Sequence, residues 1–400
     1  MGHFGFGYND FAAGGAPATA GESFYNNFTS SGVGSPYTAV TAGTDTLWAP
    51  TAVLSPTRII NMWHNGTNVA CELVSVSGST LANVDGPSNA GTASGGQVGI
   101  CAISSTKALV TYDGTSGVGK ARIIDASGDT VSFGTEFEFD AGTAQYNTPI
   151  RISDTKAVVV YRDASASSYP EYQQLDISGT TITGNTPVTL ESAACAWTGG
   201  QFTDTDKFVA CWTRTAATVA QKAAAVSLPS TVGTVTTVSS LSSSGGQTIA
   251  MAYDSSNWDS SITKMAVGFT DNGTTRMRIG TVSGTTITWG TEATIPQGHD
   301  SNDSSATVAM FSDEYGAVTI REGGSTDYRI HVTPFTVSGT TVTFASTTVE
   351  VFNPAQTGTD SITRPMGGIC IVDTDKCLVS VRIEDVASTY KRDYRILTDT

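Results

Sequence analysis

A short segment recurs seven times along this chain at a spacing close to fifty residues. In each copy a polar turn leads into an apolar strand, and the residues at the junction are Arg58, Lys107, Lys156, Lys207, Lys264, Gly316 and Lys376. The differences between these residue numbers are 49, 49, 51, 57, 52 and 60. A repeat of this length that is built from strands is typical of a β-propeller.

A second marker follows each junction by about twenty residues and supports the same period. It is a Ser-Gly turn before a Thr-rich strand, with its glycine at Gly78, Gly128, Gly179, Gly284 and Gly339, whereas the fourth copy has Leu228-Pro229. Glycine suits a hairpin turn that needs a positive φ, and β-branched neighbours suit a pleated strand. In the second repeat we expect strands over 97–103, 107–112, 120–126 and 130–137, with almost no helix anywhere.

The fold class that follows is all-β, a single seven-bladed β-propeller of four-stranded antiparallel blades over residues 31–400. The last repeat supplies only three strands, because the sequence stops at Thr400 where the others turn into a fourth. We expect residues 33–40 to supply the missing strand beside residues 394–397. This closure would remove an open sheet edge.

Composition excludes several partners. The net charge is −15 and the pI about 4.5, with 21 Lys and Arg in 400 residues, so no basic stripe favours nucleic acid or an anionic membrane surface. No apolar run is long enough to span a bilayer, and the first residues do not resemble a signal peptide.

Residues 1–30 differ in composition from the repeats and form a predicted N-terminal arm. Seven aromatic residues stand there among Gly, Ala and Asn: Phe4, Phe6, Tyr8, Phe11, Phe24, Tyr25 and Phe28. The rings either pack across the propeller or are buried against a partner. Because so much apolar surface is unfavourable in water, we expect the arm to contact another copy or another protein of an assembly.

The six cysteines show no metal-ligand spacing. Cys101 and Cys370 both lie six residues before a junction lysine, which indicates a buried position for a small side chain on the first strand of a blade. We therefore expect free structural thiols and no metal site.

No catalytic set emerges, and no cofactor is expected. Carboxylates that could form a glycosidase pair are Glu136, Asp163, Glu171, Glu292 and Glu350, but Asp-rich turns place such pairs together by chance. Asp204 with Asp206, and Asp373 with Asp375, fit turn roles better than a metal motif. The loop 299–303 has oxygen ligands but lacks the Gly and distal Glu of a calcium loop. The four histidines share no ligand spacing, and no dinucleotide-binding motif is present.

Three aromatic residues in expected loops are candidates for contact with a ligand. Tyr169, Tyr172 and Trp258 are flanked by small polar residues, which suits stacking on a sugar, although a loop aromatic is more often packed locally. They are the candidate ligand-binding residues from sequence.

The repeated sequence motifs resemble those of structural proteins of tailed bacteriophages, in which propellers occur in tail nozzles, fibres and receptor-binding parts. The residues that carry this resemblance are Asp-Thr-Asp-Lys before an apolar strand, as at 204–207, and Val-Ser-Gly-Thr-Thr-Ile-Thr, as at 282–288. The resemblance implies a non-enzymatic virion component of the tail or fibre. Its implied partners are other virion proteins in a symmetric multimer, and a host-surface glycan is a further one.

Two other classes stay open. One is an extracellular propeller that binds or cleaves carbohydrate, which glycan-array binding or turnover would identify. The other is a cellular interaction scaffold, which predicts a partner in a pulldown and no association with particles.

Overall fold

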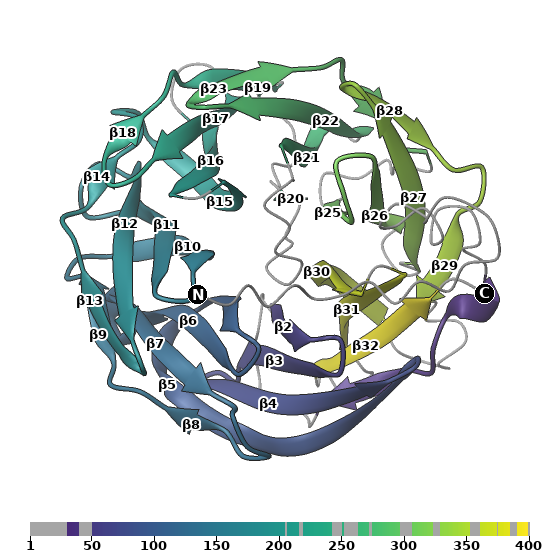
Figure 1. Cartoon of the computed structure of the whole chain (residues 1–400), viewed down its shortest axis with the longest axis horizontal. Helices are drawn as coiled ribbons and strands as arrows, with labels where there is room; N and C mark the ends of the chain where they lie inside the picture. The colour runs from purple at the N-terminus through teal and green to yellow at the C-terminus, as the bar shows by residue number, and fades with distance from the viewer. Residues whose placement is uncertain are drawn as a thin grey trace, which may run out of the picture.

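The computed structural model describes residues 30–39, 50–204, 206–215, 219–241, 250–251, 263–271, 274–296, 306–322, 329–352, 361–373, 375–384 and 390–398. The sheets stand around a common centre as a ring, so the predicted all-β propeller is confirmed (Figure 1). The predictions for the arm, Trp258 and the loop 299–303 lie outside the described residues.

Helix is nearly absent from the described residues, as the sequence predicts. Two short 3₁₀ turns occur, η1 (Ser30–Gly32) and η2 (Thr115–Gly117). In the part of the chain that the structure describes, no helix has the length and apolar character needed to cross a membrane.

Five antiparallel sheets are separate blades. One comprises β10 (Ala144–Ser153), β11 (Lys156–Asp163), β12 (Tyr169–Ser178), β13 (Thr181–Gly184) and β14 (Val188–Thr189). The next comprises β15 (Cys195–Asp204), β16 (Lys207–Arg214), β17 (Ala220–Ser227), β18 (Thr231–Val232) and β19 (Thr236–Ser240). The third comprises β20 (Ala250–Met251), β21 (Lys264–Asp271), β22 (Thr274–Ser283), β23 (Thr286–Trp289) and β24 (Ala293–Thr294).

The other two separate blades complete the C-terminal part of the ring. One comprises β25 (Thr307–Met310), β26 (Tyr315–Glu322), β27 (Arg329–Ser338), β28 (Thr341–Phe344) and β29 (Val349–Phe352). The closing blade comprises β30 (Ser361–Asp373), β31 (Lys376–Glu384), β32 (Tyr390–Thr398) and β1 (Tyr37–Ala39).

The remaining strands form one eight-stranded sheet, which corrects the prediction of seven separate blades. Its strands are β2 (Thr51–Ser55), β3 (Arg58–His64), β4 (Asn68–Ser77), β5 (Thr80–Ser104), β6 (Lys107–Gly114), β7 (Gly119–Asp125), β8 (Ser132–Phe133) and β9 (Phe137–Asp140). The physical reason is β5, which runs for 25 residues and pairs with β4 through its first half and with β6 through its second. The continuous strand thereby joins two units, each with four strand positions. In such a unit the two short outer strands, such as β8 and β9, together occupy the fourth position.

Both sequence markers occupy equivalent places. The junction residues begin the second strand of their units at Arg58, Lys107, Lys156, Lys207, Lys264 and Lys376, and β26 begins one residue before Gly316. Gly78, Gly179, Gly284 and Gly339 have φ of 58°, 64°, 60° and 60°, as the hairpin turn requires. Gly128 lies outside this left-handed region.

The outermost strand is divided where two units approach closely. In the second repeat the expected strand over 130–137 is instead β8 and β9, both paired with β7. A Cβ added to Gly134 would overlap the carbonyl oxygen of Thr180 in the next blade's Ser-Gly hairpin. Gly233 and Gly290 make the same approach to Thr285 and Thr340. Glycine at the break therefore lets neighbouring blades pack edge to edge.

The N-terminal segment closes the ring as predicted. Tyr37 pairs with Tyr394, and Val33 forms a bridge with Leu397. Gly34 donates its N–H to the oxygen of Ile396 at 2.8 Å, and a Cβ there would overlap the oxygen of Ser79. These contacts match those of the divided outer strands elsewhere, so the segment behaves as a normal fourth strand.

Apolar side chains are buried in seven clusters between neighbouring four-strand units. All six cysteines are buried and none forms a disulfide, which confirms the predicted structural thiols. The pKa of the Cys101 thiol is raised to about 12 by burial, so the thiol is protonated at neutral pH.

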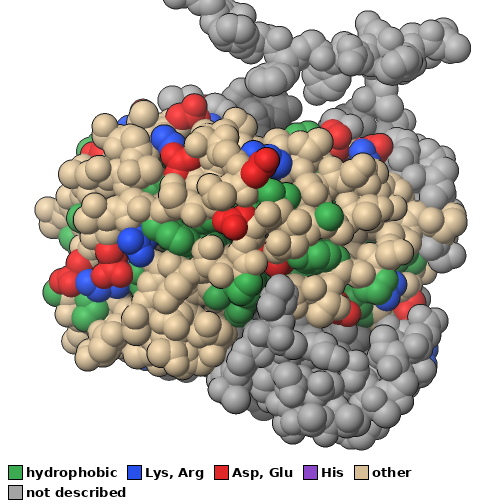
Figure 2. Space-filling view, turned by 90° about the horizontal axis from the view of Figure 1, so that it is seen from below, with side chains coloured by type: hydrophobic (Ala, Val, Ile, Leu, Met, Phe, Trp, Pro, Cys, Tyr) green, Lys and Arg blue, Asp and Glu red, His purple; other side chains and the backbone are tan. Residues whose placement is uncertain are grey.

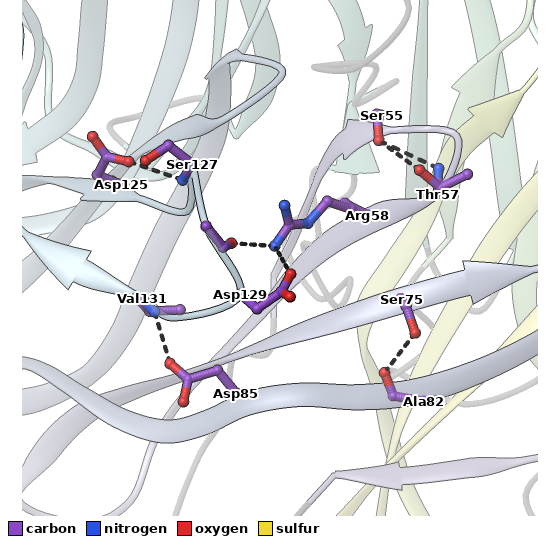
Figure 3. A network of polar contacts seen from close by, with 11 residues as sticks. Ser55, Thr57, Arg58, Ser75, Ala82, Asp85, Asp125, Ser127, Asp129 and Val131 are labelled. Carbon is purple, nitrogen blue, oxygen red and sulfur yellow. Dashed lines mark hydrogen bonds and ion pairs between the residues drawn. The ribbon is translucent and has the colours of Figure 1, made fainter.

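Polar contacts also connect the two units of the eight-stranded sheet (Figure 3). The Arg58 guanidinium reaches the oxygen of Gly128 and the carboxylate of Asp129, and Asp85 accepts the N–H of Val131 at 2.7 Å. Much of the described surface on the face shown in Figure 2 is uncharged. Its acidic and basic side chains are scattered, and several of them lie next to a side chain of opposite charge.

Candidate functional site

Tyr172, a sequence candidate for ligand binding, is a core residue. Its side chain is fully buried in β12, its ring lies 5.1 Å from that of Phe208, and its hydroxyl donates to the oxygen of Pro229 at 2.9 Å. The prediction that Tyr172 is an exposed loop aromatic is wrong, because β12 begins at Tyr169 and strand alternation turns Tyr172 towards the next blade.

Replacing Tyr172 by Phe is expected to lower the free energy of unfolding by about 1 kcal/mol, since it removes one buried hydrogen bond and keeps the ring packing. Urea denaturation measures the change. The control is Tyr169→Phe, a partly buried tyrosine three residues away, with an expected change below about 0.5 kcal/mol. An equal or larger loss at Tyr169 would contradict the assignment.

The carboxylates that could have formed a catalytic pair are dispersed, and most bind side chains of their own unit. Glu292 lies 3.5 Å from Arg276, and Glu350 lies 3.3 Å from Arg329. Glu136 lies 3.2 Å from Lys120 and accepts the Tyr112 hydroxyl. Asp163 and Glu171 do share a blade, on the paired strands β11 and β12.

The paired aspartates take part in ion pairs near their turns. Asp204 lies 2.8 Å from Lys207, and Asp206 lies 2.6 Å from Lys156 of the preceding blade. Asp373 and Asp375 lie 3.9 and 3.6 Å from Lys376. These aspartates therefore have a structural role, as predicted. They fill it through ion pairs as well as through their positions at the turns. Within the described residues, no group of His, Cys, Asp and Glu is arranged to hold a metal.

Two partly buried aromatic rings meet between neighbouring inner strands. Tyr146 lies on β10 and Trp197 on β15, each ten residues before its junction lysine, and their ring centroids are 4.6 Å apart with an interplanar angle of 43°. Both residues have a left-handed backbone, with φ of 55° and 52°, where the strand pairing shifts register. Bulges of this kind re-aim side chains and are common beside binding sites.

The second strand and the loop after it contribute a cation and a hydroxyl. The Arg162 guanidinium carbon lies 5.9 Å from the centroid of Tyr146, and its Nη2 donates to Ser168 Oγ at 2.8 Å. Ser168 in turn accepts the N–H of Cys195 at 2.8 Å, two residues before Trp197. We call Tyr146, Arg162, Ser168 and Trp197 the aromatic site.

Backbone strain is concentrated here. Six described non-glycine residues have positive φ, and four of them are Tyr146, Ser167, Ser168 and Trp197. Left-handed backbone at a bulky residue costs of order 1–3 kcal/mol and persists where the surroundings hold it, often at ligand sites.

Neighbouring side chains hold the strained backbone in place. Gln97, at the equivalent position one unit earlier, accepts the N–H of Tyr146, and Thr198 Oγ1 donates to the Tyr146 oxygen. Thr148 Oγ1 donates to the Thr198 oxygen at 3.2 Å. These bonds cross from one inner strand to the next, so the rings are pre-organised.

A buried carboxyl supports the same strand. Asn147, next to Tyr146, donates to Asp113 Oδ1 at 2.8 Å, and both side chains are buried. Burial raises the pKa of Asp113 to about 8, and the hydrogen bond from Asn147 opposes this shift. Asp113 is therefore largely protonated at neutral pH.

Sequence reasoning missed Tyr146 and Trp197 and found only Tyr169 near this end of the blade. Tyr169 pairs with Asp163, the neighbour of Arg162, so its backbone lies at the same end of the strands. The available signal was the shared position ten residues before Lys156 and Lys207, where an aromatic residue occurs twice.

Comparisons with known proteins identify the fold. No family model matches the sequence, and no curated protein matches it. A solved lectin from Burkholderia pseudomallei aligns over 89% of this chain and 99% of that chain, with a TM-score of 0.58 and 11% identity. A hypothetical selenium-binding protein from Sulfolobus tokodaii aligns over 88% and 91%, with a TM-score of 0.51 and 7% identity. At these identities the likeness concerns the fold alone.

Proposed function

We propose that this chain is a non-catalytic carbohydrate-binding propeller whose ligand contacts the aromatic site. The observation that carries the proposal is the pair of partly buried rings, Tyr146 and Trp197, held on left-handed backbone between two inner strands. A folding requirement alone gives no reason to retain such strain at two bulky residues.

The chemistry of the site suits a sugar. Aromatic rings bury the C–H faces of a pyranose, while the Tyr hydroxyl and nearby Ser and Arg donors bind its hydroxyls. Side chains with few rotatable bonds lose little conformational entropy on binding. The lectin of similar fold supports the proposal only in that such a ring is compatible with glycan binding.

The virion role inferred from the repeated sequence motifs is a proposal that is compatible with carbohydrate binding. A propeller that binds a glycan could serve in a virion that attaches to a cell surface. Mass spectrometry of purified particles from the source sample would test the location independently of glycan binding.

We also propose that the eight-stranded sheet acts as two blades, which makes a ring of seven. Support comes from the pairing of β5 with β4 in its first half and β6 in its second. The seven apolar clusters between successive units give further support. An experimental density map with six or eight radial units would contradict the count.

The function is tested by a glycan array followed by calorimetric titration of the best ligand. Trp197→Ala is expected to weaken binding at least about tenfold, because an aromatic contact contributes of order 1 kcal/mol beyond its buried area. Trp289→Ala is the matched control: this partly buried Trp lies on the outer strand β23, where its N–H bonds to Thr236 at 2.9 Å. Equal loss in both variants, or binding unaffected by Trp197→Ala, would exclude the aromatic site.

A further inference from the structure

Arg162 has no carboxylate partner among the described residues, unlike three arginines that lie near the ends of second or third strands in other blades. Arg214, Arg276 and Arg329 lie 3.6, 3.5 and 3.3 Å from Glu191, Glu292 and Glu350. Arg162 instead donates to Ser168 through Nη2, and its Nε is buried without a hydrogen-bond partner. A guanidinium has five N–H donors, so most of its binding capacity is unused.

Strand alternation keeps nearby acids on the other side of the blade. Tyr161 and Asp163 flank Arg162 on β11 and therefore project to the opposite face. Tyr161 packs in the cluster shared with the preceding unit, and its hydroxyl donates to Glu171 at 3.2 Å. Burial raises the pKa of Glu171, and the nearby carboxylates of Asp163 and Asp140 raise it further, which places them in that same acidic group.

Glu191 lies near Arg162, since both groups act on the Cys195 thiol, but this acid already has other partners. Glu191 accepts the N–H of Trp212 at 2.9 Å and lies 3.6 Å from Arg214. Within the described part of the chain, Arg162 thus forms no ion pair, although the net charge of the protein is −15.

We propose that Arg162 binds an anionic group of the sugar, so that the ligand is an acidic glycan with a carboxylate or a sulfate ester. This inference rests on the proposed carbohydrate function and specifies its ligand class. The planar fork of a guanidinium fits either group through two parallel hydrogen bonds. The sugar ring contacts Tyr146 and Trp197 while its anionic group takes the donors that Ser168 leaves free.

The test compares ligands that differ only in charge. Oligogalacturonides are titrated against their fully methyl-esterified forms, and dextran sulfate oligosaccharides against unsulfated dextran oligosaccharides of equal length. For at least one pair we expect the acidic member to bind about 10- to 100-fold more tightly, as for a charge-assisted contact. The pair that shows the difference distinguishes carboxylate from sulfate.

Variants assign the preference to Arg162. Arg162→Gln is expected to remove it, so that the acidic and neutral members of a pair then bind with similar affinity, and Arg162→Lys is expected to restore part of it. Arg58→Gln is the control, because it makes the same charge change at the other end of the strands, where Arg58 contacts Asp129. Melting temperatures confirm that each variant is folded.

The outcomes separate the two proposals. Binding that depends on Trp197 but is equal for neutral and acidic members would overturn the role of Arg162 and leave the carbohydrate function intact. Loss of the preference in Arg58→Gln as well would show a general charge effect and would also overturn it. Absence of binding to any glycan overturns both.

Discussion

Deleting residues 1–41 is expected to lower the melting temperature by roughly 10 °C, because it opens the ring. The deletion removes β1, exposes the edge of β32, and takes Ala39 and Val33 from two apolar clusters. A loss of roughly 5 kcal/mol is of the size expected when several core contacts disappear together.

The same deletion breaks a buried polar network. The Tyr37 hydroxyl donates to Glu72 at 3.1 Å, and Asn61 and Asn83 donate to the same carboxylate at 3.0 and 3.2 Å. Glu72 is fully buried, and burial raises its pKa. Removal of Tyr37 leaves this carboxylate with one donor fewer in the protein interior, which adds to the cost.

Two controls make the closure prediction specific. Deleting residues 1–28 removes none of the described contacts, so we expect a change of less than about 2 °C. Gly34→Val keeps the chain length but places a side chain against Ser79, and it should reproduce part of the large loss. Equal melting temperatures for both deletions would show that β1 does not secure the ring.

The period of the fold was readable from sequence because the turns impose it. Gly78, Gly179, Gly284 and Gly339 recur where a hairpin needs positive φ, so each marks the same place in its unit. Closure followed from the missing fourth strand at the C-terminus. The joined sheet was not predictable, because nothing in the residues of β5 distinguishes one strand of 25 residues from two shorter strands with a connection.

The aromatic site was less accessible, since it depends on contacts between blades. Tyr146 and Trp197 are 51 residues apart in the sequence and meet only when two inner strands lie side by side. Their left-handed backbone has no sequence signal, because neither is a Gly or Asn. Tyr172 was wrongly predicted to be exposed, because its neighbours in the sequence are polar. Its burial comes from contacts with the next blade, which the sequence does not show.

The last expected result concerns pH and Asp113. Because its folded-state pKa of about 8 lies well above the usual value near 4, the folded protein holds this proton more tightly than the unfolded chain does. The stabilisation is complete below about pH 4 and is lost as the pH rises through 8. Asp113→Asn cannot ionise, so its stability relative to the wild type should increase across this range, by roughly 5 kcal/mol at most.

Melting curves of both proteins between pH 5 and pH 9 measure this difference. Asp129→Asn, which removes a carboxylate whose side chain is 91% exposed, is the control and should follow the wild-type curve. Asn147 connects Asp113 to the strand that carries Tyr146, and a buried negative charge is unfavourable there, so ionisation of Asp113 should also loosen the aromatic site. Ligand affinity should therefore fall above pH 8 in the wild type and stay constant in Asp113→Asn. Parallel stability curves for the two proteins would show that Asp113 is ionised in the folded state throughout.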